Sequence, residues 1–125
     1  MSHPIVHIEF WNKDPDAAAK FYSELFGWTI DRSPMPGDFP GEYVQFSSGE
    51  GSLSGAFPQA DGDITQPGEV LVYVGADDIP GTLKRVEELG GTVVSPEQEI
   101  PGIGWFGIFT DTAGNRVALY KSIQQ

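Results

Sequence analysis

Residues 14–28 alternate apolar and polar positions with the period of an α-helix. The ends of the segment are also marked, because an aspartate and a proline open it and a glycine stands at position 27. The aspartate can accept a hydrogen bond from the first turn, the proline needs no donor there, and glycine tolerates a left-handed backbone. We therefore predict a helix near residues 14–26, whose apolar stripe consists of Ala18, Phe21, Tyr22 and Leu25.

The same design returns 64 residues later, where Asp78 takes the place of Asp14. Apolar residues again recur with helical spacing, and two consecutive glycines follow the segment. The sequence therefore predicts a second helix near residues 78–90. A repeat with a period of about half the chain indicates two similar units, at about residues 1–62 and 63–125.

The segments around the two helices alternate with the period of two that is typical of β-strands. Each half then has the order β-α-β-β-β. This order predicts an α+β fold in which two helices cover one face of a cupped eight-stranded mixed sheet. Prolines and glycines predict loops at 33–41 and 96–104 and a linker at 58–68. The predicted strands are 4–11, 28–32, 42–47, 52–57, 69–75, 92–95, 105–110 and 116–121.

Two residues of the first predicted strand can carry chemistry. His7 and Glu9 lie on the face opposite the apolar residues, because successive strand residues alternate between faces. The imidazole suits proton transfer, and the carboxylate can orient it or charge it. We name both as candidate catalytic residues. The alternatives are a structural histidine and a solvated acid at the rim of the sheet.

Composition narrows the range of partners. The chain has 125 residues, a net charge of −11 and no cysteine, and its few basic residues are scattered. Nucleic acid and anionic membrane surfaces are disfavoured by this charge, and no apolar run approaches the roughly 20 residues that span a bilayer. We expect a single cytoplasmic domain without disulfides.

Four runs of sequence resemble those of a known family. They are HIEF, DPDAAAKFYSELFGW, DDIPGTLKRVEELGG and IPGIGWFGIFTDTAGNRVALY. They closely resemble the vicinal oxygen chelate superfamily, which includes glyoxalase I, the bleomycin-resistance proteins, the fosfomycin-resistance enzymes and the extradiol dioxygenases. The resemblance covers nearly the whole chain and implies a single-domain, glyoxalase-like protein that pairs as a homodimer.

The resemblance also implies where a metal would bind. Metal-using members take four ligands, which are His, Glu or Gln side chains, from strands one, four, five and eight. In this chain these positions fall on His7, Gly55–Ala56, Leu71 and Ala118, of which only His7 has a ligand atom. Useful sites need about three or more protein ligands. We therefore expect no metal and no other cofactor.

Aromatic residues are expected to line the concave face of the sheet. Tyr73 and Tyr120 fall on its cavity side by alternation, while Phe57 and Trp105 stand at strand ends near the mouth. An apolar cleft with a few polar groups is typical of small-molecule sites. We name these four residues as candidate ligand-binding residues; the alternative is that their rings belong to the core.

Three functions remain open at this stage. We expect first a metal-free module that binds a small molecule in the aromatic cleft. The alternative is a glyoxalase-like lyase or isomerase that uses His7 and Glu9 without a metal. A metal-dependent lyase or dioxygenase is favoured by His7 and opposed by the other three ligand positions.

Overall fold

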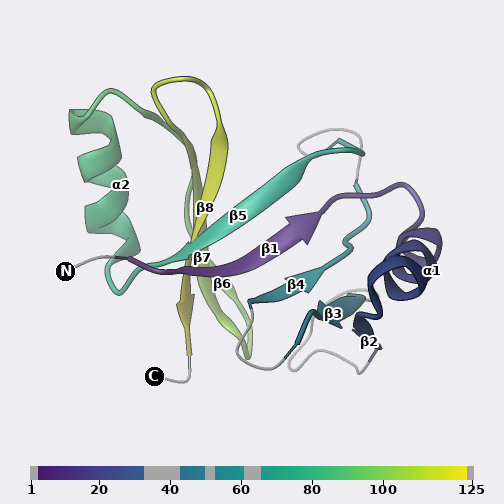
Figure 1. Ribbon diagram of the computed structural model, residues 1–125. Helices are drawn as coiled ribbons and strands as arrows, with labels where there is room; N and C mark the ends of the chain where they lie inside the picture. Colours follow the sequence, from purple (N-terminus) through teal and green to yellow (C-terminus); the bar gives the residue numbers. More distant parts are fainter. Residues whose placement is uncertain (1–2, 33–42, 50–52, 61–65, 124–125) are drawn as a thin grey trace. The chain divides into compact units, whose positions relative to one another are not determined.

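A computed structural model describes residues 3–32, 43–49, 53–60 and 66–123 (Figure 1). Its elements follow the order β-α-β-β-β twice, as predicted. They are β1 (Ile5–Phe10), α1 (Pro15–Phe26), β2 (Thr29–Asp31), β3 (Gln45–Ser47), β4 (Ser54–Ala56), β5 (Val70–Gly75), α2 (Ile79–Glu88), β6 (Thr92–Ile100), β7 (Gly104–Thr110) and β8 (Arg116–Ser122).

The strands form one eight-stranded sheet in the order β2-β3-β4-β1-β5-β8-β7-β6. Within each half the first strand pairs in parallel with the fourth, since β1 pairs with β4 and β5 with β8. The pairs β2–β3, β3–β4, β6–β7 and β7–β8 are antiparallel. The mixed sheet of two repeated units is therefore confirmed, whereas its predicted cupped shape stays a prediction.

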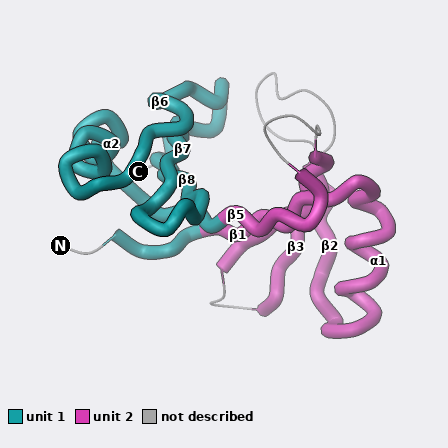
Figure 2. The backbone as a smooth tube through the Cα atoms, turned by 90° about the horizontal axis from the view of Figure 1, so that it is seen from above, with its two compact units in different colours: residues 1–6, 36–39, 72–125 teal, residues 7–35, 40–71 magenta. Residues whose placement is uncertain are grey.

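The chain divides into two compact units (Figure 2). Unit 1 holds the described residues of 1–6 and 72–125, and unit 2 holds those of 7–35 and 40–71. The first residues of the chain thus belong with the second half. His7 and Glu9 both lie in unit 2.

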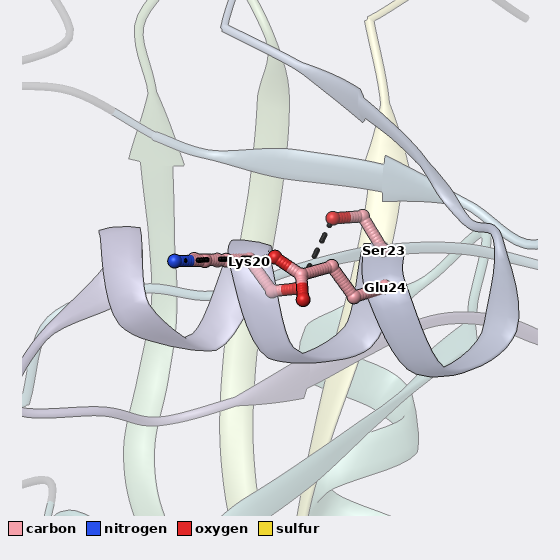
Figure 3. A network of polar contacts seen from close by, with 3 residues as sticks. All are labelled: Lys20, Ser23 and Glu24. Carbon is pink, nitrogen blue, oxygen red and sulfur yellow. Dashed lines mark hydrogen bonds and ion pairs between the residues drawn. The ribbon is translucent and has the colours of Figure 1, made fainter.

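Helix α1 has the predicted ends. The Asp14 Oδ1 accepts a hydrogen bond from the Ala17 N–H at 3.2 Å. Gly27 is left-handed, with φ 74°, and its N–H donates to the Ser23 carbonyl at 2.9 Å. On the outer surface, Lys20 and Glu24 form an exposed ion pair at 4.0 Å, and the Ser23 hydroxyl donates to the Lys20 carbonyl at 3.2 Å (Figure 3). Such exposed pairs add little stability, so the helix depends on its buried side.

The buried side of α1 differs from the predicted stripe. Ala18 and Ala19 are buried and Tyr22 packs against the core, whereas Phe21 is 59% and Leu25 58% exposed. The side of α1 that faces the core therefore carries Ala18 and Ala19 and is turned away from Phe21 and Leu25. Short alanine side chains let α1 approach the aromatic core closely.

The core of unit 2 is a stack of aromatic rings. Trp28 and Phe46 have ring centroids 4.5 Å apart, and Tyr22 stacks on Phe57 at 5.3 Å. Phe10 of β1 packs against the same cluster. The apolar face of β1 is therefore turned to this core, as predicted, and His7 and Glu9 lie on the other face.

A glycine in β4 makes room for this stack. A Cβ atom at Gly55 would overlap the ring of Phe46, so any side chain there would force this ring out of the stack. Gly55 is one of the two residues at the metal-ligand position that was predicted on the fourth strand. Core packing explains the glycine itself, which faces Phe46, whereas Ala56 pairs with Glu9 and alternates to the other face.

Unit 1 is organised around α2. The Asp78 Oδ1 accepts from the Gly81 N–H at 3.0 Å, which caps the helix as predicted. Ile79 and Leu83 are buried and pack with Leu119. In the described part of the chain, neither helix is long and apolar enough to cross a membrane.

The predicted loop at 96–104 is partly wrong, because β6 continues to Ile100. Its pairing with β7 shifts register twice, between Val93 and Ser95 and between Ser95 and Gln98. The second of these irregularities spans Pro96, which has no N–H to donate. Since β6 is an edge strand, a proline is tolerated there. Of the other predicted loops, 33–41 lies outside the described residues and 58–68 is described only at its ends.

Candidate functional site

The candidate site lies in unit 2, where β1 runs parallel to β4 (Figure 1). The register places His7 opposite Ser54 and Glu9 opposite Ala56. His7 is half-buried, Glu9 is buried and Ser54 is exposed. The strand pair therefore leads from the surface at Ser54 toward a buried carboxylate.

Glu9 is only 4% exposed. The hydroxyl of Tyr43 donates a close hydrogen bond to Glu9 Oε2. Burying a carboxylate is costly unless it is hydrogen-bonded, and Tyr43 supplies such a bond. The alternative of a solvated acid at the rim is therefore wrong.

His7 contacts a hydroxyl group with each ring nitrogen. Its Nε2 lies 2.8 Å from the Tyr43 hydroxyl oxygen, and its Nδ1 lies 2.6 Å from Ser54 Oγ. The rings of His7 and Tyr43 are stacked with centroids 6.2 Å apart. The four side chains form one hydrogen-bonded chain, Ser54–His7–Tyr43–Glu9, which we call the hydroxyl–imidazole chain.

Burial lowers the pKa of His7 from 6.5 to about 4, because the charged imidazolium is poorly solvated there. At neutral pH the ring is therefore neutral. Efficient general bases have a pKa near the working pH, so a ring with this pKa is better suited to hydrogen bonding than to taking a proton. The lowered pKa therefore counts against His7 as a general base at neutral pH.

Sequence reasoning missed Tyr43 and Ser54. Tyr43 precedes the core residues Val44 and Phe46, and simple alternation from these two already places it on the outer face. Ser54 offered no such signal, because its place opposite His7 depends on the register between strands 47 residues apart.

Phe57 lies elsewhere than predicted. It has no exposed surface and belongs to the aromatic core of unit 2, where its ring stacks on Tyr22 with an interplanar angle of 9°. This packing argues against the predicted direct contact with a ligand. The core alternative explains the residue.

The other three candidate aromatics lie in unit 1. Trp105 packs against the core of that unit, and Lys121 Nζ lies 5.7 Å from its ring centroid. The Tyr120 hydroxyl donates to the Ile103 carbonyl at 3.4 Å. Tyr73 is half-buried and pairs in register with Ala118. That these residues share a cavity with His7 and Glu9 stays a prediction.

The residues at the expected metal-ligand positions do not fit a metal. Ala56, Leu71 and Ala118 are buried and apolar. Among the described residues, no group of three His, Asp or Glu side chains is arranged to hold an ion. In a neutral imidazole only one of the two nitrogens has a lone pair that can bind a metal. In His7 a hydroxyl group already contacts each nitrogen. A metal would have to displace one of these hydroxyls.

Comparisons with known proteins agree with this fold. The chain is 33% identical to the anthracycline biosynthesis protein DnrV of Streptomyces peucetius over 127 residues, which cover 91% of this chain and 45% of DnrV. It therefore spans about half the length of that relative. A glyoxylase-like domain-containing protein of Didymella fabae is 31% identical, with 90% of this chain and 88% of that protein covered.

A solved structure supports the fold at lower sequence identity. Methylmalonyl-CoA epimerase, in complex with methylmalonyl-CoA and NH4+, superimposes with a TM-score of 0.70 at 16% identity and covers 99% of this chain and 97% of that chain. At this identity the similarity shows the fold alone. The family model for the Glyoxalase/Bleomycin resistance protein/Dioxygenase superfamily matches residues 4–119. The chain belongs to the glyoxalase/bleomycin resistance protein/dioxygenase superfamily.

Proposed function

We propose that the chain binds a small organic molecule, without a metal, at the surface end of the hydroxyl–imidazole chain. The observation that carries the proposal is that both nitrogens of His7 are engaged by hydroxyl groups, at 2.6 and 2.8 Å. The imidazole is thereby held in one orientation, with its lone pair directed to a protein hydroxyl.

The burial of Glu9 supports the same proposal. A carboxylate buried on the face away from the hydrophobic core adds nothing to core packing and costs solvation energy. Through Tyr43 it holds the orientation of His7. A fixed polar group of this kind is what orients a ligand in a small-molecule site.

The names of two similar proteins are compatible with this proposal. One is named for anthracycline biosynthesis, and the other is an epimerase solved with a coenzyme A thioester. Both names refer to organic small molecules. The chain covers 45% of the first protein and is 16% identical to the second, so the proposal extends only to the class of small organic molecules.

A thermal-shift screen of small organic molecules, with and without Zn²⁺, Ni²⁺, Mn²⁺ and Fe²⁺, tests the proposal. A ligand that binds the native state raises the melting temperature by mass action. We expect stabilisation by an organic molecule that is independent of all four ions and is smaller in Ser54→Ala. Ser23→Ala on the surface of α1 is the matched control (Figure 3).

Metal content is measured on the same protein, purified without chelator or affinity tag. We expect elemental analysis to find less than one equivalent of metal per chain. One equivalent of Zn, Ni, Mn or Fe that is lost on His7→Ala would contradict the proposal and favour a metal-dependent, glyoxalase-like activity.

The second candidate function is a metal-free lyase or isomerase that uses His7 and Glu9. It is favoured by the contact of the buried Glu9 with His7 through Tyr43, which provides a path for a proton. It is opposed by the lowered pKa of His7. Incorporation of deuterium from solvent into a bound ligand, lost in His7→Gln, would favour it over simple binding.

A further inference from the structure

We infer that the hydroxyl–imidazole chain has one direction, so that Ser54 Oγ meets the ligand as a hydrogen-bond acceptor. The site would then select molecules that present a donor, such as a phenolic hydroxyl group. This inference rests on the proposed function and specifies the chemical class of its ligand. A ligand that presents only a carbonyl group would not fit this site, because it would need a hydrogen-bond donor from the protein.

The direction is set at the buried end. A carboxylate accepts hydrogen bonds and has no proton to donate. Tyr43 has a single hydroxyl proton, and this proton is donated to Glu9. The Tyr43 oxygen can therefore only accept from His7, so that Nε2 carries the imidazole proton.

The imidazole ring of His7 continues the same direction of donation. A neutral imidazole carries one N–H, and its other nitrogen accepts. With the proton on Nε2, Nδ1 accepts from the Ser54 hydroxyl at 2.6 Å. The low pKa of His7 supports this state, because an imidazolium would donate from both nitrogens. Each group thus donates its proton to the next group inward.

Ser54 stands at the exposed end of the chain. Its proton is directed inward, while a hydroxyl oxygen carries two lone pairs that accept hydrogen bonds. A ligand donor would extend the same direction by one more bond. A net hydrogen bond changes affinity by about three- to tenfold.

Three probes of similar size separate the alternatives: p-cresol, its methyl ether 4-methylanisole, and 4-methylbenzaldehyde. Only p-cresol carries a donor. Titrations followed by NMR on ¹⁵N-labelled protein give a dissociation constant for each probe from the signals of residues 7, 43 and 54. We expect p-cresol to bind about three- to tenfold more tightly than the ether and the aldehyde.

Two variants test whether the direction causes the preference. Ser54→Ala removes the acceptor at an exposed position, and we expect the affinity ratio of p-cresol to its ether to fall to about one. Glu9→Gln preserves side-chain volume, but its amide can donate to Tyr43 and so allows the opposite direction. We expect this variant to lower the ratio although Ser54 is intact. Ser23→Ala should keep the wild-type ratio.

Failure of the donor preference and failure of the proposed binding site give different results. Equal affinities for p-cresol and its ether, or tighter binding of the aldehyde, would overturn the donor preference and leave the proposed binding site. Binding of other molecules at these residues, but of none of the three probes, would also overturn it. If no molecule perturbs residues 7, 43 and 54, the proposed function fails together with the inference.

Discussion

The buried His7 should make the stability of the protein depend on pH in a defined interval. Its pKa is about 4 in the folded chain, against the ordinary 6.5. Between these values the unfolded chain binds a proton that the folded chain does not. The free energy of unfolding must therefore fall as pH falls from 6.5 toward 4, and His7 contributes no further slope below pH 4.

The size of the effect follows from the interval. One pKa unit corresponds to about 1.4 kcal/mol, so a lowering from 6.5 to about 4 amounts to about 3 kcal/mol over the full interval. This is a large part of the roughly 5–15 kcal/mol that stabilises a typical domain. The effect should therefore be measurable by equilibrium unfolding.

The perturbation that isolates this effect is His7→Gln. Glutamine does not titrate, and its amide can still donate to Tyr43. We expect wild type to lose up to about 3 kcal/mol more than the variant between pH 6.5 and 4. Urea unfolding followed by circular dichroism across this range measures both proteins. Carboxylates titrate in both, so they cancel in the difference.

His3→Gln is the matched control, because it removes the other histidine, which is exposed. The difference in pH dependence between His and Gln at position 7 should persist when position 3 carries Gln. If the curves of wild type and His7→Gln stay parallel from pH 6.5 to 4, His7 is not held neutral by burial. The reasoning about its proton would then be refuted.

Three further predictions follow from the packing and the sequence. Tyr43→Phe removes the hydroxyl that donates to buried Glu9, and urea unfolding at neutral pH should report a loss of about 1–3 kcal/mol; no loss would mean that Glu9 has adequate other partners. Gly55→Ala brings a Cβ atom against the Phe46 ring and should lower the melting temperature and the near-ultraviolet circular dichroism, whereas a wild-type spectrum and stability would contradict the packing. We also propose that the chain is a homodimer, which analytical ultracentrifugation would report as twice the monomer mass of 13.6 kDa; a monomer in concentrated solution would contradict it.

Local signals explain why the helices were predictable. The capping hydrogen bond of Asp14 and the left-handed Gly27 involve residues within a few positions of one another. Burial is not local in this way. Phe21 belongs to the apolar residues of α1 but is exposed, because the core meets the side of the helix that carries its alanines.

The strands likewise include features that local sequence predicts and features that depend on the sheet. Alternation in β1 correctly separated Phe10, which packs in the core, from His7 and Glu9 on the opposite face. Pro96 suggested a loop, but β6 passes through it because irregular pairing at the sheet edge removes the need for its N–H. The continuation of β6 through Pro96 depends on its position at the edge of the sheet, and the local sequence does not reveal that position.

In the candidate site, the residues on one strand were predictable and the contacts between distant strands were not. His7 and Glu9 are two positions apart on one strand, so the period of two brings them to one face. Their link through Tyr43 requires the segment just before β3 to lie near β1, and the contact of His7 with Ser54 requires one particular register of β4. Both conditions depend on strand pairing between distant segments.

The protonation state of His7 tests the central claim most directly. Long-range ¹H–¹⁵N correlation spectra at neutral pH distinguish the two nitrogens of the ring. We predict a neutral ring with the proton on Nε2 and an unprotonated, hydrogen-bonded Nδ1, unchanged by one equivalent of Zn²⁺. A proton on Nδ1, a charged ring, or a shift of the His7 nitrogens on stoichiometric binding of Zn²⁺ would contradict the account.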